Sequence, residues 1–150
     1  MNEYEKKVVN KALKIMEEHH KPGEKLSSPS AAKNWLRLRL KDKKHEIFGC
    51  IFLDARKRIQ HIEDIFTGTV HSTKIHARTI VEKAIEHNSD SIILYHNHPS
   101  GNAKPSQGDI ILTRKLEEIL KHMDITIVDH LVVSHSDSKS IYSMAKMGLL

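Results

Sequence analysis

Two histidines in the middle of the chain have a spacing that suits metal binding. His96 and His98 end a run of β-branched and aromatic residues that starts near residue 92, and such a run predicts a buried strand. Because side chains two residues apart on a strand point to the same face, both imidazoles can contact one ion. Pro99 then ends the strand.

A helix after this strand supplies a third candidate ligand. Residues 99–105 are rich in Gly, Pro, Ser and Asn, which indicates a loop, and apolar residues with helical spacing follow. We therefore expect a helix over residues 106–123, with Asp109 in its first turn and facing back toward the strand. Two imidazoles, one carboxylate and an open fourth position suit catalytic zinc, because that position can hold a water whose pKa falls to about 7. Manganese, iron or nickel can occupy similar ligand sets.

The same residues have an interpretation without catalysis. Ser106 and Asp109 match the form of an N-terminal capping box, in which the pair only satisfies free amides at a helix start. The His-x-His pair is weak by itself in a chain with 12 histidines. The His96/His98 pair and the Ser106/Asp109 pair occur together across a strand–loop–helix junction, and this combination favours a metal site over capping alone.

The apolar pattern predicts the elements that position these residues. Helices are expected over residues 2–20, 28–40 and 76–87, and strands over 46–54, 59–66 and 125–133, with a short edge strand over 140–144. Four residues of the third helix are expected to face the core: Ile80, Val81, Ala84 and Ile85. The strand–helix–strand–helix order favours an α/β fold with helices packed on a sheet.

Length and composition fit one folded domain. We expect a domain over residues 23–150 and a helical appendage over residues 1–22, with a boundary near Pro22 and Gly23. The single cysteine, Cys50, is expected to be a buried, inert thiol. The N-terminus is charged and the apolar runs are far shorter than the roughly 20 residues of a membrane span, so we expect a cytoplasmic protein without a secretory signal.

The charge of the chain permits several partners and demands none of them. A formal net charge of +5 allows contact with nucleic acid or with an acidic protein. The basic residues of segment 33–44 are more simply a solvated helix face, because no aromatic residues interleave with them to stack on bases.

The residues around the two histidines resemble a known signature. The pattern His96-x-His98-x7-Ser106-x-x-Asp109 is similar to that of the JAMM (MPN-plus, JAB) metalloproteases, and the fuller text His-Asn-His-Pro-Ser-Gly resembles their bacterial RadC-like branch. Further stretches that agree with this branch are 45–48, 52–54, 68–69, 129–130 and 148–150. The resemblance covers roughly residues 27–150. It leaves out the first predicted helix, and the helix-hairpin-helix region that precedes the domain in full-length RadC-like proteins has no counterpart in this sequence.

The resemblance implies a fold, a metal and a reaction. The fold is a mixed β-sheet packed between helices, the cytidine-deaminase-like three-layer architecture of JAB and MPN domains. The reaction is hydrolysis of a peptide or isopeptide bond, with one zinc ion on His96, His98 and Asp109. Glu46 matches the family's general base, although by itself it would be interpreted as an exposed carboxylate at a strand end. Ser106 would donate a hydrogen bond to the bound water or to the developing oxyanion.

Two other functions stay open. RadC-like proteins have long carried a DNA-repair label, so a DNA-associated module linked to DNA repair or to mobile elements is one alternative. A metal-free MPN scaffold is the other, and the presence of all expected ligands and of the base disfavours it. The sequence does not identify a peptide or protein substrate. Nucleic acid and a second copy of the chain stay open as partners, and a membrane is not expected.

The remaining polar residues have less specific interpretations. Asp129 and His130 interrupt an apolar strand, and they either orient a metal-ligating imidazole or form an ordinary satisfied pair. His45 should point away from the site, because it precedes Glu46 on the same strand. Six other histidines are expected at surface or capping positions: His61, His71, His76, His87, His122 and His135.

Overall fold

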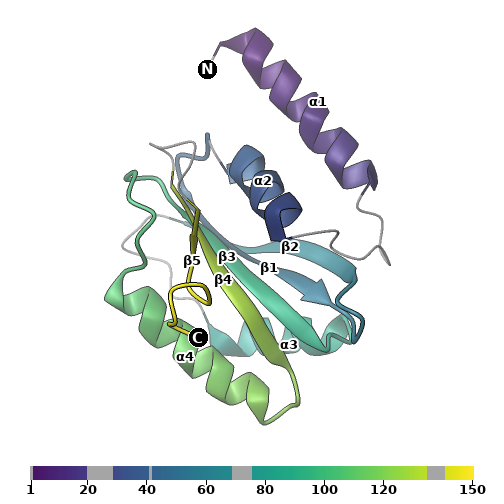
Figure 1. The fold of residues 1–150 in the computed structure, drawn as a ribbon, viewed down its shortest axis with the longest axis vertical. Coiled ribbons are helices and arrows are strands. Elements are labelled where there is room, and N and C mark those ends of the chain that lie inside the picture. The colour runs from purple at the N-terminus through teal and green to yellow at the C-terminus, as the bar shows by residue number, and fades with distance from the viewer. Residues whose placement is uncertain (1, 20–28, 41, 69–75, 135–140) are drawn as a thin grey trace.

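The predicted elements are present in the structure, with ends that differ from the prediction by at most two residues. A computed structural model describes residues 2–19, 29–40, 42–68, 76–134 and 141–150 (Figure 1). The elements are α1 (Glu3–His19), α2 (Pro29–Leu40), β1 (Glu46–Leu53), β2 (Ile59–Gly68), α3 (Ala77–Glu86), β3 (Ser91–His98), α4 (Gln107–Lys121), β4 (Thr126–Ser134) and β5 (Ile141–Ser143). The predicted boundary near Pro22 and Gly23 lies outside the described residues, as do His71 and His135.

The strands form one mixed sheet. Its order is β2-β1-β3-β4-β5, with β3 and β4 parallel and the other neighbouring pairs antiparallel. Two parallel strands need a long crossover connection, and α4 is part of the one that joins β3 to β4. The sheet with its helices confirms the predicted α/β class and is consistent with a JAB/MPN fold.

Alternate side chains of the strands build two separate cores. On one face, α3 and α4 cover residues such as Phe48, Cys50, Phe52, Ile92, Leu94 and Ile127. On the other face, α2 covers residues such as Ile47, Ile51, Ile93, Tyr95, Leu131 and Val133. Figure 1 shows α2 on one side of the sheet and α3 and α4 on the other, which gives three layers. This division follows from the period of two along each strand.

One residue of α3 was predicted to face the core and does not. Ile80 and Ala84 are fully buried and Val81 is partly buried, whereas the Ile85 side chain is 54% exposed. Successive residues of a helix are about 100° apart, so a narrow contact centred on Ile80 and Ala84 turns Ile85 toward solvent.

Most of the described side chains of α1 are exposed, and Leu13 packs partly against the α2-side core. The division of the chain at residue 22 stays a prediction. No helix within the described part of the chain is long and apolar enough to cross a membrane.

The Tyr95 side chain lies against Gly49 on the α2 side of the sheet, and this contact requires a glycine. A Cβ atom added to Gly49 would lie 2.3 Å from the ring and the hydroxyl of Tyr95. The Tyr95 hydroxyl donates a 2.6 Å hydrogen bond to Asp64, and Arg39 forms a 2.6 Å ion pair with the same carboxylate. Arg39 also lies over the ring of Trp35, at 5.0 Å. At least this member of the basic segment therefore has a structural role.

Candidate metal centre

Three side chains from β3 and α4 meet at one point. His96 and His98 lie on the face of β3 that α4 covers, and their Nε2 atoms are 2.9 Å apart. Asp109, in the first turn of α4, places Oδ2 at 3.3 Å from His96 Nε2 and at 3.1 Å from His98 Nε2. The His96 side chain is 1% exposed, and those of His98 and Asp109 are 16% and 17% exposed.

These distances fit one bound ion. In a tetrahedral zinc site with bonds of about 2.0–2.1 Å, neighbouring ligand atoms are about 3.3 Å apart. The three separations of 2.9, 3.1 and 3.3 Å are close to that edge length. The three donor atoms therefore already form one face of such a tetrahedron.

The hydrogen bonds of His98 decide which of its nitrogens carries a proton. His98 Nδ1 lies 2.6 Å from the backbone carbonyl of Asn102, which can only accept. Nδ1 must therefore be the protonated nitrogen of the neutral ring. The lone pair on Nε2 then points toward Asp109.

A longer chain of hydrogen bonds decides the same question for His96. The Thr113 hydroxyl donates its one proton to the Asp109 carbonyl at 2.7 Å, so it must accept from His130 Nδ1 at 2.6 Å. His130 then has a lone pair on Nε2, which accepts from His96 Nδ1 at 2.8 Å. His96 Nε2 is left without a proton and faces the site. Backbone and hydroxyl groups thus assign both imidazoles the tautomer that a metal needs.

The site is electrostatically prepared for a cation. Burial raises the pKa of Asp109, but the neighbouring His96 and His98 imidazoles and the hydrogen bond from the Ser106 amide outweigh it, and the net pKa lies well below its ordinary value. Burial lowers the pKa of His98, but the neighbouring Asp109 carboxylate and the hydrogen bond to the Asn102 carbonyl outweigh it, and the net pKa is raised, so a proton on Nε2 competes with a metal ion for this site. Two lone pairs and a carboxylate oxygen in contact repel one another unless a proton or a metal ion lies between them.

His130 remains neutral in this arrangement. The ring is fully buried, and this burial, with the neighbouring His96 as a smaller cause, holds the pKa of His130 well below its ordinary value. Phe48 packs edge-on against it, with ring centroids 5.6 Å apart. A neutral ring with one donor and one acceptor nitrogen is what the hydrogen-bond chain requires.

Asp129 and His130 turn out to have different roles. His130 contacts the candidate ligand His96, as the hypothesis of an orienting residue requires. Asp129 lies away from the site and accepts hydrogen bonds from the Ser143 hydroxyl at 2.6 Å and the Ala145 amide at 3.0 Å. Strand alternation separates the two side chains, so they do not form the Asp–His pair of the second interpretation, and Asp129 is satisfied instead by Ser143, Ala145 and the backbone amide of His130.

Ser106 and Asp109 form the capping box that was the alternative to catalysis. The Ser106 hydroxyl accepts from the Asp109 amide at 3.1 Å, and Asp109 Oδ2 accepts from the Ser106 amide at 2.7 Å. A hydroxyl that accepts one bond still has its own proton to donate. Capping therefore leaves the Ser106 O–H available to a water or substrate.

Glu46 begins β1 and shares the face of Phe48. Its carboxylate lies within 4.8 Å of the donor atoms of His96, His98 and Asp109. Burial raises the pKa of Glu46, and the charges of His96 and His98 partly offset this. The half-buried carboxylate therefore holds a proton more readily than an exposed one does.

Asn97 fixes the backbone on both sides of Glu46. Its side-chain carbonyl accepts from the Ile47 amide at 2.6 Å, and its amide donates to the His45 carbonyl at 3.0 Å. Asn97 is 3% exposed, so neither bond is exchanged for water at low cost. The residue between the two histidines thus ties the base candidate on β1 to the ligand strand β3.

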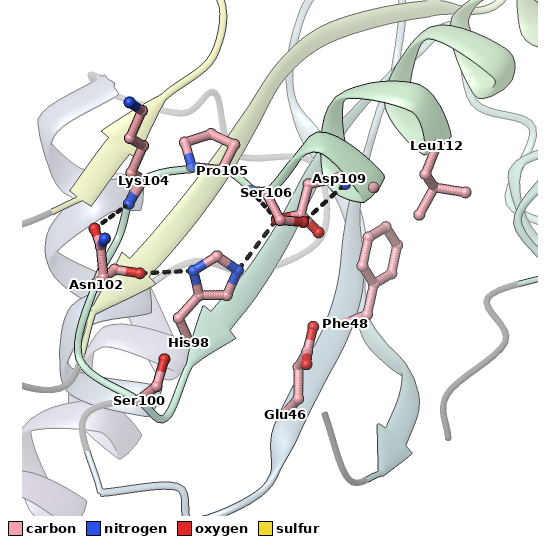
Figure 2. Close-up of a pocket in the computed structure, with 11 residues that line it drawn as sticks. Glu46, Phe48, His98, Ser100, Asn102, Lys104, Pro105, Ser106, Asp109 and Leu112 are labelled. Atoms are coloured by element: carbon pink, nitrogen blue, oxygen red, sulfur yellow. Dashed lines mark hydrogen bonds and ion pairs between the residues drawn. The ribbon is translucent and has the colours of Figure 1, made fainter. Parts of the chain in front are cut away.

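An open cavity of about 690 Å³ lies beside the candidate ligands. Figure 2 shows Glu46 from β1 and His98 from β3 pointing into it, with Ser106 and Asp109 entering from the start of α4. Its lining combines polar and apolar residues: Glu46, Phe48, His98, Ser100, Asn102, Lys104, Pro105, Ser106, Gly108, Asp109 and Leu112. Both carboxylates and Ser106 are therefore part of the cavity wall.

The sequence analysis does not identify three residues of the site: Asn97, Thr113 and Asn102. Asn97 is a polar residue within an apolar strand, which is the same signal that singles out His130. Thr113 lies four residues after Asp109 and so on the same face of α4, which was the available signal for it. The carbonyl of Asn102 acts through the backbone, which residue type cannot reveal.

Comparison with known proteins places the chain in a family. The family model described as the RadC-like JAB domain matches residues 26–149. The UPF0758 protein YkfG of Escherichia coli is 38% identical over 151 residues, which cover 100% of this chain and 94% of that protein. UPF0758 proteins of Thiobacillus denitrificans and Azotobacter vinelandii are 42% and 43% identical, over 89% and 83% of this chain. The chain spans only 59% and 54% of the length of these two relatives, and none of the three names states an activity.

Proposed function

Because the chain belongs to the RadC-like JAB domain family, we propose that it is a zinc-dependent hydrolase of peptide or isopeptide bonds. The observation that carries the proposal is the meeting of two imidazole lone pairs and one carboxylate oxygen within 3.3 Å of one another, beside an open cavity. His96, His98 and Asp109 would hold the ion. A bound zinc ion lowers the pKa of a water molecule and polarises a carbonyl group.

The other residues of the site transfer the proton, stabilise the developing charge and line the cavity. Glu46 accepts a proton from the attacking water and donates it to the leaving amine. The Ser106 hydroxyl donates a hydrogen bond to the oxygen on which negative charge develops, a contribution of about 3 kcal/mol in comparable sites. Phe48 and Leu112 provide an apolar part of the cavity wall.

The first test is the metal content of the untagged full chain. We expect zinc at His96, His98 and Asp109, measured by elemental analysis and by competition with a chromophoric chelator. His96→Ala/His98→Ala should lose this zinc, whereas His122→Ala, an exposed histidine outside the site, should retain it. If the wild-type chain takes up no zinc that depends on His96 and His98, the hydrolase proposal is wrong, and the scaffold and the DNA-associated module remain.

The second test separates metal binding from chemistry. Glu46→Gln keeps the shape of the side chain and removes the base, so it should retain zinc and lose roughly 10²–10⁴-fold in hydrolysis. A library of peptides and lysine isopeptides would serve as substrates. Cleavage that is equal in wild type and Glu46→Gln would exclude the proposed role of Glu46. Binding of DNA that weakens steeply with salt, without any cleavage, would favour the DNA-associated alternative.

A further inference from the structure

A second cluster of metal-ligating side chains lies at the edge of the sheet, on β2 and at the end of α3. His61 and Glu63 are two residues apart on β2 and pair with Phe52 and Cys50, whose side chains face α3. His87 is the C-cap of α3. Two strand residues and one helix end therefore bring two imidazoles and a carboxylate together. None of these residues belongs to the candidate metal centre.

The donor atoms of this cluster face one another. Glu63 Oε2 lies 3.3 Å from His87 Nε2 and 3.8 Å from His61 Nε2. One ligand atom from each residue lies within 4.8 Å of the other two. The edges of a zinc tetrahedron are about 3.3 Å long, so the Glu63–His87 pair already has the required separation, whereas the more exposed His61 ring must turn out of its stack with His87 for its lone pair to reach the same ion.

Neighbouring side chains surround the cluster. The ring of His87 lies 4.7 Å from that of Phe52 and 4.3 Å from that of His61. Lys83 binds the other carboxylate oxygen, Glu63 Oε1, at 3.1 Å, and so leaves Oε2 to the imidazoles. The C-terminal end of a helix carries partial negative charge, which favours a cation beside His87. The side chains are 20–48% exposed, so an ion can enter from solvent.

We propose that His61, Glu63 and His87 form a second zinc site. Two imidazoles and one carboxylate select zinc or a similar ion such as cobalt or nickel, whereas calcium and magnesium prefer oxygen ligands. The site is independent of the proposed hydrolase activity, because it shares no residue with the cavity. The ammonium group of Lys83 repels a divalent cation, so this site binds zinc more weakly than His96, His98 and Asp109 do.

Zinc stoichiometry tests the proposal on the untagged full chain. At saturating zinc we expect two ions per wild-type chain and one in His61→Ala/His87→Ala. His122→Ala is the matched control, because His122 is also an exposed histidine at the C-cap of a helix, and it should still bind two. One ion in wild type that is lost only in His96→Ala/His98→Ala would overturn the second site and leave the proposed function intact. One ion that is lost only in His61→Ala/His87→Ala would do the opposite.

The lysine offers a second test that does not remove a ligand. Lys83→Gln deletes the competing charge and keeps all three donors, so zinc binding at the second site should become tighter by up to roughly tenfold. Circular dichroism would verify that the variants are folded. Unchanged or weaker binding in Lys83→Gln, measured in a chain that is folded, would overturn the proposal.

Discussion

His130 Nε2 lies 2.8 Å from His96 Nδ1, and this contact determines which nitrogen of His96 faces the candidate metal centre. If His130 carried its proton on Nε2, that N–H would face the N–H of His96 Nδ1. His96 would then have to move its proton to Nε2, the nitrogen that faces the metal centre. The Thr113 hydroxyl prevents this, because it donates to a carbonyl and can only accept from His130. A residue of α4 thus controls a ligand on β3 through one intermediate ring.

The first prediction concerns Thr113. Thr113→Val keeps the shape of the side chain and removes the acceptor for His130 Nδ1, so the tautomer of His96 is no longer fixed. Residues that orient metal ligands typically contribute about 10–100-fold to metal affinity, and we expect a loss of that size in a zinc competition assay. Thr113→Ser is the control, because it retains the hydroxyl and should bind zinc as wild type does. Equal affinities in the two variants would contradict the proposed tautomer chain.

Asn97 should affect catalysis more than metal binding. Asn97→Ala leaves the Ile47 amide and the His45 carbonyl without their partner, at a cost of about 1–3 kcal/mol for each buried unpaired group. Because these groups flank Glu46, we expect hydrolysis to fall by at least about tenfold, while zinc affinity changes little. Parallel measurement of zinc binding and hydrolysis checks this. A loss of zinc with retained hydrolysis rate per bound ion would contradict it.

Ser106 allows its capping role to be separated from its catalytic one. Ser106→Ala removes the N-cap of α4 and should lower the free energy of unfolding by about 1 kcal/mol. It should also lower hydrolysis by about 10²–10³-fold if the hydroxyl donates to the developing charge. Ser106→Asp restores a good N-cap but has no proton to donate at neutral pH. We therefore expect urea denaturation of this second variant to resemble wild type and its hydrolysis to remain low.

The approach of Tyr95 to Gly49 predicts a large effect from one methyl group. Gly49→Ala places Cβ 2.3 Å from the Tyr95 ring and 2.6 Å from the Glu63 carbonyl, and strand backbone cannot yield easily. We expect a loss of about 3 kcal/mol or more in the free energy of unfolding, measured in urea. Gly108→Ala is the contrasting control, because the added Cβ meets only Ser106 Oγ at 3.7 Å in a helix. It should be neutral or stabilising by up to about 1 kcal/mol.

Cys50 should be unreactive in the folded protein. The thiol is fully buried beneath α3 and α4, and burial raises the pKa of Cys50 far above its ordinary value. We expect an aromatic disulfide reagent at pH 8 to modify it only as fast as the protein unfolds. The rate in native buffer and in urea gives the comparison. Rapid stoichiometric modification in native buffer would contradict the position of this strand in the core.

The sequence predicted the elements well because apolar periodicity is local. The runs in β1, β3 and β4 and the spacing in α3 and α4 are visible without knowledge of their neighbours. Ile85 was assigned wrongly, because its burial depends on how wide a face of α3 the sheet and α4 cover. That width is set by residues distant in the chain.

Residue types and spacing predict the candidate ligands, but they do not predict the residues that orient those ligands. Thr113 and His130 act only because α4 and β4 bring them together over 17 positions of sequence. His61 and His87 were predicted as surface or capping residues, and the structure confirms an exposed position for His61 and a C-cap position for His87. That the two rings stack at 4.3 Å depends on the packing of α3 against the sheet edge.

Asp109 contacts both ends of the hydrogen-bond chain that runs through His96, His130 and Thr113. Its carboxylate faces His96 Nε2, and its backbone carbonyl accepts the bond from Thr113 that ends the chain beginning at His96 Nδ1. The effect of a substitution at Thr113 therefore depends on the residue at position 130, and the reverse also holds. Replacing either alone leaves a buried polar group unpaired, and replacing both by apolar residues leaves the buried His96 Nδ1 without its acceptor. Lineages that keep His96 as a ligand should accordingly keep both of these positions able to form hydrogen bonds.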